Sequence, residues 1–326
     1  MKISAKVKSI IFGGLALLLV LEAFDLFGGY DYLKSLSFSP TKEMTTIISS
    51  LKLTERGERT LRATTPTLDS RDVFNEKCNS HKAEVYVLGC YLTGDDSIHL
   101  YAIDKKELAG MNESTAAHEL LHAVYHRLPF WEKSKVNEEL SAAYENLNDE
   151  ELKAAMDLYD DEDFYDELHS RLGTEIKDLP ENLEKHYAKI FSDRKKVVAF
   201  YDNYSGTFKK LKDDLKTTEE KLNNLKVKIE DEEGRLKKVT TDLNERIDDY
   251  NRRVSEKKYS TIAEIKNEGK NLQAEVDKIN SDYDALSSNI SEYNKLVAEY
   301  NNSVIRTNEI FDSINSNSSV VETVNK

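Results

Sequence analysis

The feature that most constrains this chain is a seven-residue repeat of apolar side chains in its C-terminal third. Alternating steps of three and four are typical of helices that pack along one seam. The repeat comprises Phe208, Leu211, Leu215, Leu222, Leu225, Ile229, Leu236, Val239 and Leu243, and then Ile262, Ile265, Leu272, Val276, Ile279, Tyr283, Leu286, Ile290, Tyr293, Val297, Tyr300 and Val304. The polar segment 255–261 between the two stretches is out of register. We predict an antiparallel helical hairpin over residues 205–315 with its tip there; a single rod that dimerises is the alternative.

The composition agrees with long, solvated helices. Of the 326 residues, 39% are hydrophobic and 33% are charged, a balance too polar for one large core. The net charge of −14 argues against a nucleic-acid partner, because phosphate binding needs a basic face.

The N-terminus carries a targeting signal. Three lysines precede an apolar run at residues 10–21, and Glu22 separates this run from a second apolar stretch that ends at Phe27. The first run is shorter than the about 20 residues that a spanning helix needs, so a cleaved signal peptide is the alternative to an anchor. No small-residue cleavage site follows, and we predict a single-pass membrane anchor over residues 1–28. Both alternatives export the rest of the chain.

Export bears on the two cysteines. Cys78 and Cys90 flank a predicted strand at Ala83–Leu88. In an exported protein an even number of cysteines favours a disulfide bond, and two unrelated buried thiols are the alternative.

Between the anchor and the hairpin we expect a connector at residues 29–41 and a mixed domain at residues 42–204. Turn residues 93–96 lie between β-prone stretches, so residues 83–104 are predicted to form a β-hairpin. Helices are expected over residues 41–61, from Thr115 (capped by Asn112 or Ser114) to Pro129, and around 133–158, 162–172 and 181–202, with Gly173 as a C-cap. The Asn- and Ser-rich tail at residues 316–326 is predicted to be disordered. The fold class is thus mainly α with a small β-hairpin or sheet, a long coiled-coil hairpin and an N-terminal transmembrane helix.

The run His118-Glu119-Leu120-Leu121-His122 carries the candidate chemistry. Residues four apart lie on one face of a helix, so the two imidazoles can bind one Zn²⁺. Glu119, at the edge of that face, can take a proton from a water and deliver it to a leaving amine. The alternative is a solvated helix with two incidental histidines.

The stretch from Thr115 to Ala123 resembles the active-site helix of the zincin metallopeptidases. By this resemblance His118 and His122 are zinc ligands, Glu119 is the general base, and the stretch Ile98–Tyr101 is the edge strand of the cleft. The metzincin extension needs Gly and His where this chain has Tyr125 and Leu128, so the gluzincin type, with a glutamate as third ligand, is expected.

Several residues compete for the remaining roles. Glu167, in a stretch that resembles the gluzincin Asn-Glu-x-x-Ser/Ala pattern with Asp166 in place of Asn, is favoured as third ligand. Glu138 and Glu175 are the other glutamate candidates, and His126 is either a further ligand or a neighbour of the site. Position suggests three candidates for an oxyanion stabiliser, namely Tyr101, His186 and Tyr187.

The resemblance implies a membrane-anchored, exported zinc metallopeptidase that acts on peptides or proteins on the extracytoplasmic side. The coiled-coil hairpin would be a spacer, a gate over the cleft or an arm for a protein partner or self-association. A non-enzymatic cell-envelope scaffold with a structural or vestigial metal site is the alternative. An amidase acting on cell-wall peptide would differ from the peptidase only in its substrate.

Overall fold

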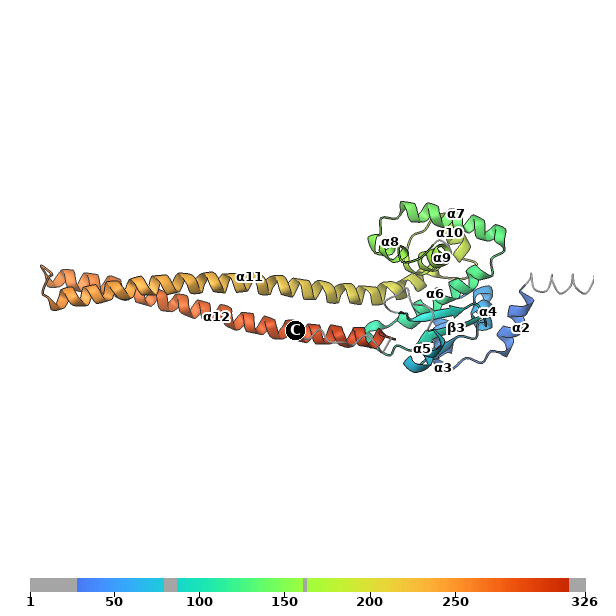
Figure 1. Cartoon of the computed structure of the whole chain (residues 1–326), viewed down its shortest axis with the longest axis horizontal. Coiled ribbons are helices and arrows are strands. Elements are labelled where there is room, and N and C mark those ends of the chain that lie inside the picture. The colour runs from blue at the N-terminus through green and yellow to red at the C-terminus, as the bar shows by residue number, and fades with distance from the viewer. Residues whose placement is uncertain (1–27, 79–86, 161–162, 317–326) are drawn as a thin grey trace, which may run out of the picture. The chain divides into compact units, whose positions relative to one another are not determined.

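The structure is a computed structural model that describes residues 28–78, 87–160 and 163–316 (Figure 1). The predicted anchor lies outside the described residues except for Gly28, as do residues 83–86 of the predicted strand and the tail from residue 317. Within the described ranges, no helix is both long and apolar enough to cross a membrane.

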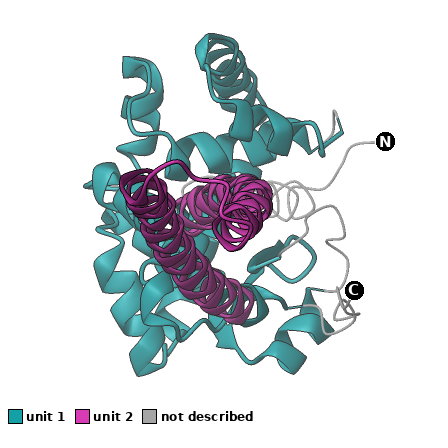
Figure 2. Cartoon of the chain, turned by 90° about the vertical axis from the view of Figure 1, so that its left-hand side faces the viewer, with its two compact units in different colours: residues 1–207, 310–326 teal, residues 208–309 magenta. Residues whose placement is uncertain are grey.

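The chain divides into two compact units (Figure 2). Unit 1 comprises the described parts of residues 1–207 and 310–326, and unit 2 comprises residues 208–309. The predicted mainly helical class with a small sheet and long helices is confirmed. The end of the last long helix, however, belongs to unit 1 and not to the hairpin.

Unit 1 is built largely from short helices. Their bounds are α2 Gly29–Ser37, α3 Lys42–Ser50, α4 Glu55–Ala63, α5 Arg71–Lys77, α6 Met111–His126, α7 Phe130–Asn146, α8 Glu150–Met156, α9 Phe164–Glu175 and α10 Glu181–Tyr187, with a 3-10 turn at Lys106–Leu108.

Three helical segments differ from the sequence expectations, and two of the differences have local causes. The helix expected over residues 41–61 is split, because Lys52 has a φ of 51° and the hydroxyl of Thr54 accepts from the amide of Gly57 to begin α4. Asp149 caps α8 in the same way and divides the helix expected at 133–158. Residues 29–37 of the expected connector are helical.

The start of α6 also differs from the expectation. Its N-cap is Gly110, with a φ of 97°, a backbone conformation that favours glycine. Asn112 does not cap the helix; its side chain bonds both backbone groups of Ile103. The helix ends at His126, just before Pro129, as expected.

The sheet has three strands in the order β1-β3-β2. β2 (Gly89–Leu92) and β3 (Ser97–Tyr101) form the predicted hairpin, although its first strand begins at Gly89. β1 (Thr67–Asp69) pairs in parallel with β3 and was missed, since the sequence there indicates only a break. The assignment of Ile98–Tyr101 as the edge strand was wrong: β3 is central and fully buried, and β2 is the terminal strand.

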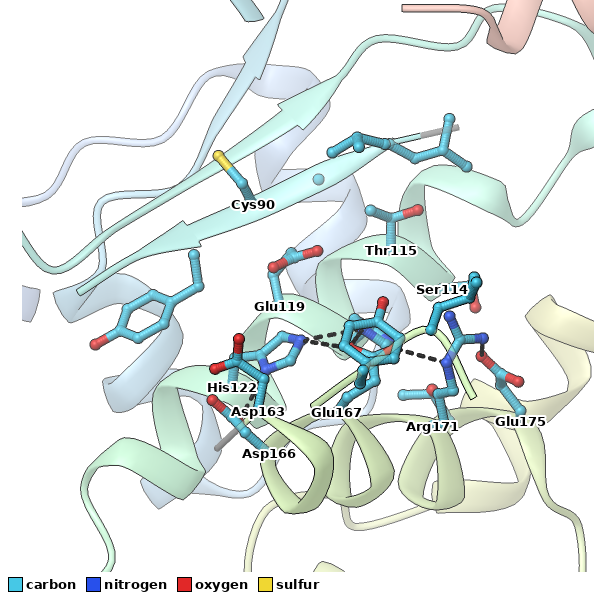
Figure 3. Close-up of a pocket in the computed structure, with 18 of the residues that line it drawn as sticks. Cys90, Ser114, Thr115, Glu119, His122, Asp163, Asp166, Glu167, Arg171 and Glu175 are labelled. Carbon is cyan, nitrogen blue, oxygen red and sulfur yellow. Dashed lines mark hydrogen bonds and ion pairs between the residues drawn. The ribbon is translucent and has the colours of Figure 1, made fainter. Parts of the chain in front are cut away.

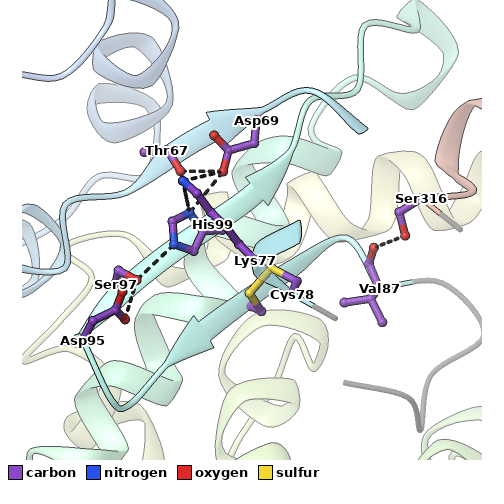
Figure 4. The surroundings of a disulfide bond; sticks show 10 residues. Thr67, Asp69, Lys77, Cys78, Val87, Asp95, Ser97, His99 and Ser316 are labelled. Atoms are coloured by element: carbon purple, nitrogen blue, oxygen red, sulfur yellow. Dashed lines mark hydrogen bonds and ion pairs between the residues drawn. A yellow bond between two sulfur atoms is a disulfide. The ribbon is translucent and has the colours of Figure 1, made fainter. Parts of the chain in front are cut away.

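The predicted disulfide between Cys78 and Cys90 is present and joins the end of α5 to β2 (Figure 4). The C-terminal end of the described chain lies against the same region. The hydroxyl of Ser316 donates to the carbonyl of Val87 at 3.0 Å, and the side-chain amide of Asn75 donates to the carbonyl of Ser316. The C-terminal end of the described chain thus lies beside the residues that precede β2.

Unit 2 is an antiparallel pair formed by residues 208–255 of α11 (Arg194–Ser255) and residues 262–309 of α12 (Ile262–Ile314). Heptad residues from both helices are buried along the seam, namely Leu236, Leu243, Leu272, Ile279 and Leu286. Arg235 contacts Asp282 and Arg246 contacts Glu275 across it, each at 2.6 Å. The chain reverses at residues 256–261, as the loss of register predicts.

Candidate metal centre

Three side chains converge at one point in unit 1. His118 and His122 come from α6, and Glu167 comes from α9. The two Nε2 atoms are 3.1 Å apart, and Oε2 of Glu167 lies 3.5 Å from Nε2 of His118 and 3.4 Å from Nε2 of His122. Ligands bound to Zn²⁺ at about 2.0–2.1 Å and at tetrahedral angles are about 3.3 Å from one another. The triangle therefore has the size of one face of a zinc tetrahedron.

The packing of α9 on α6 creates this geometry. Gly173 lies inside α9 and is not a C-cap, which corrects the sequence interpretation. A Cβ atom at Gly173 would collide with the side chain of Leu121, so the glycine lets the two helices approach closely. Leu121 and Leu168 are both fully buried in the main core. The core thus holds the Glu167 backbone opposite the exposed side of the histidine pair.

Asp166 orients His122. Its Oδ1 lies 2.9 Å from Nδ1 of His122, and its Oδ2 lies 2.9 Å from Nε2 of His126 (Figure 3). A carboxylate that accepts from Nδ1 leaves the lone pair of Nε2 directed at the shared point. His126 is therefore a neighbour of the site through Asp166 and lies outside the triangle.

Arg171 orients Glu167. Its Nε lies 2.5 Å from Oε1 of Glu167, one helical turn earlier, while Oε2 faces the histidines. Its Nη1 contacts Oε1 of Glu175 at 3.1 Å. Glu175 is thus engaged by Arg171 and does not complete the triangle. Glu138, the other candidate, is exposed on α7 and also lies outside it.

The electrostatics of the cluster favour a bound cation. Burial alone would lower the pKa of His118 and His122, but the carboxylates of Glu167 and Asp166 outweigh it and raise both values. Burial alone would raise the pKa of Glu167, yet His118 and Arg171 hold it well below its ordinary value. The carboxylate is consequently ionised, and the positive charge it attracts can be supplied by protons or by a metal ion.

Glu119 lines the same pocket as the triangle. It is buried and lies between His122 and the strand that carries Cys90 (Figure 3). A Cβ atom at Gly89 would be 2.7 Å from Oε1 of Glu119 and 2.6 Å from the methyl group of Thr115. Only glycine at position 89 therefore allows β2 to pass this close to the carboxylate.

A pocket of about 770 Å³ gives access to these groups. One wall is β2 with the residues before it, and the other walls are α6, α9 and the loop before α9. Two tyrosines, Tyr159 and Tyr204, also line it. Neither is predicted from the sequence, because neither belongs to a motif and only the tertiary packing brings them to the site.

The expected oxyanion stabilisers lie elsewhere. Tyr101 belongs to a separate small core with Phe74. The Tyr187 hydroxyl donates to the carbonyl of His169, and Nε2 of His186 lies 2.9 Å from Nε2 of His169. None of the three lines the pocket described above.

A second polar network surrounds His99 (Figure 4). Its Nδ1 is 3.1 Å from Oδ2 of Asp69, and its Nε2 is 3.0 Å from Oγ of Ser97, the order of a Ser-His-Asp triad. The Ser97 hydroxyl is buried, however, and donates to Asp95 at 2.8 Å. These residues do not line the pocket, and the network satisfies buried polar groups of the sheet.

Comparisons with family models, with curated proteins and with solved structures return no match for this chain. The functional assignment therefore rests on the geometry of the site.

Proposed function

We propose that this chain is a zinc-dependent peptidase whose metal ligands are His118, His122 and Glu167. The convergence of two imidazole nitrogens and one carboxylate oxygen on a single point carries the proposal. Two nitrogens and one oxygen suit Zn²⁺, and three protein ligands that line a pocket would leave room for a water ligand, which is typical of catalytic rather than structural zinc.

Each neighbouring residue has a role in this chemistry. Zn²⁺ bound here would act as a Lewis acid and lower the pKa of a water toward neutrality. Glu119 accepts a proton from the attacking water and passes it to the leaving amine. Asp166 and Arg171 hold the ligand atoms in place, which lowers the cost of organising the site.

The location of β2 supports a peptide as the substrate. β2 is the terminal strand of the described sheet and lines the pocket next to Glu119. An extended peptide can add to such a strand through main-chain hydrogen bonds, which recognise any sequence. We infer that the substrate lies along β2, with its scissile carbonyl between Glu119 and the ligand triangle.

The proposed location is the extracytoplasmic face of a membrane. Two features support it, the lysine-flanked apolar segment before Gly28 and the Cys78–Cys90 disulfide, because disulfides persist in oxidising compartments. Membrane anchoring by residues 1–28 and a partner for the hairpin are parts of the same proposal.

The test is cleavage of a peptide library by the full chain, before and after removal of metal by a chelator. We expect cleavage to stop and to return with added zinc. Glu119→Gln should lower the rate by about 10³-fold while the zinc stays bound. Glu138→Gln, an exposed acid on α7, is the matched control and should cleave like the parent.

Two results would contradict the peptidase proposal. One is a Glu119→Gln protein that cleaves as fast as the parent. The other is a zinc-loaded parent that cleaves no library peptide, which would favour the scaffold role with a structural metal.

A further inference from the structure

Helix α2 is amphipathic, but its apolar side faces outward and its polar side faces unit 1. Its large apolar side chains face outward: Tyr30 is 57% exposed, Tyr32 51%, Leu33 58% and Leu36 66%. A surface helix of a globular protein normally buries its apolar side and solvates its polar side. The outward stripe therefore needs an explanation other than folding of unit 1.

The inward side of α2 is held by charges. Asp31 contacts Arg127 at 2.8 Å, and Lys34 contacts Asp96 at 3.0 Å. Arg127 and Asp96 are also 2.8 Å apart, so the four groups form one network with two charges of each sign. Turning the helix over would break the two ion pairs that α2 makes, so the network fixes which side of α2 faces outward.

Two further exposed aromatic residues lie at the start of α7. Phe130 is 82% exposed and Trp131 is 66% exposed at the start of α7. They follow Arg127, the residue that binds α2, by only three and four positions. In Figure 1 the start of α7 lies at the same end of unit 1 as α2. Large apolar side chains exposed along one side of a helix are typical of an interaction site.

We propose that the outward side of α2, together with Phe130 and Trp131, lies in the interfacial region of a lipid bilayer. The sequence directly before Gly28 supports lipid as the occupant, since residues 10–27 are apolar apart from Glu22 and Asp25 and lysines precede them. Tyrosine and tryptophan favour the headgroup level of a membrane, and leucines of an interfacial helix enter the acyl boundary. The contact would fix the orientation of unit 1 on the membrane, independently of any peptidase activity.

The experiment uses the full chain reconstituted in phosphatidylcholine/phosphatidylglycerol vesicles. Trp131 is the only tryptophan, so Trp131→Phe with Leu33→Trp places a single fluorophore on α2. We expect a blue-shifted emission and quenching by lipids brominated on the acyl chains. The matched control is Trp131→Phe with Tyr283→Trp on the hairpin, at a position that is 42% exposed. The emission of this tryptophan should not be quenched by the brominated lipids.

Native Trp131 gives a second readout. Leu33→Gln with Leu36→Gln should reduce its quenching by brominated lipids at least twofold. Zinc content unchanged from the parent shows that unit 1 is folded in this variant.

Three outcomes would overturn the proposal. The first is equal quenching of the α2 and hairpin fluorophores, including the case in which the chain does not associate with vesicles. The second is a blue shift without lipid quenching, as expected if residues 1–27 cover α2. The third is a blue shift that depends on protein concentration, as expected for a second copy. Loss of peptidase activity has no bearing on any of them.

Discussion

The two units place their charges differently. In unit 1, Glu167 is 4% exposed, and its carboxylate contacts His118, His122 and Arg171. The buried carboxylate is thus held in place by side chains that can carry positive charge. In unit 2 an apolar seam holds two helices together, and the arginines and carboxylates lie along its exposed margins. Buried charges are costly unless they are paired, and they are retained where they have a function. This difference supports the proposal that the metal centre lies in unit 1.

The largest expected effect separates the stability of the hairpin from the metal centre. Leu236 is fully buried in the seam, so Leu236→Ala should destabilise the hairpin by about 2–5 kcal/mol, as measured by chemical denaturation. Zinc content should not change. Val239→Ala, at a heptad position that is 36% exposed, is the control and should cost much less. Loss of zinc in Leu236→Ala would show that the units depend on each other.

The response to pH should also differ between the units. Burial and the nearby Lys189 lower the pKa of His186 to about 4, below its ordinary value of 6.5. The unfolded chain therefore binds the extra proton first, and the stabilisation present above pH 6.5 is lost as the pH falls toward 4. Between pH 7 and pH 5 the free energy of unfolding of the parent should fall by about 2 kcal/mol more than that of His186→Gln.

The hairpin provides the contrast for this measurement. Arg246 lowers the pKa of Glu275, so the stabilisation from that pair is lost only as the pH falls below the ordinary range of a carboxyl group. Glu275→Gln should leave the change between pH 7 and pH 5 as in the parent. If the Glu275→Gln and His186→Gln variants show the same change in stability between pH 7 and pH 5, the two units do not differ in their response to pH.

A smaller effect is expected from the residue that orients His122. Asp166→Asn should weaken zinc binding by about 10- to 100-fold, because the ligand loses its charged partner. Competition with a colorimetric chelator measures this. Asp163→Asn, in the same pocket but outside the described contacts of the triangle, should bind zinc like the parent. If the two variants bind zinc with the same affinity, Asp166 does not orient His122 for metal binding.

The smallest effect is expected on the surface of unit 2. Arg246 and Glu275 are both largely exposed, and exposed ion pairs contribute little and are screened by salt. Arg246→Met should shift the thermal unfolding of the hairpin by less than the error of the measurement. A shift comparable to that of Leu236→Ala would mean that the margins, and not the seam, hold unit 2 together.

The features that the sequence predicts are those with local periodicity. The heptads give the hairpin and its tip near Ser255, and the spacing of His118 and His122 gives one face of a helix. Glu167 was also singled out, since it lies in a short helix beside apolar Leu168.

Features that depend on tertiary packing were not predicted. β1 has three residues and is a strand only because β3 pairs with it. In the sequence Gly173 has the position of a C-cap, but in the structure it lies inside α9, where it makes room for the side chain of Leu121. Residues 29–37 were interpreted as a connector, whereas they form α2, whose large apolar side chains are exposed.

The most direct test of the account is the zinc content of the purified full chain, measured by elemental analysis for the parent, Glu167→Ala and Glu175→Ala. We expect one zinc per chain in the parent and in Glu175→Ala, and a loss of zinc in Glu167→Ala. A Glu167→Ala protein that keeps its full zinc content, or a parent that binds none, would contradict the proposal that His118, His122 and Glu167 form one metal centre.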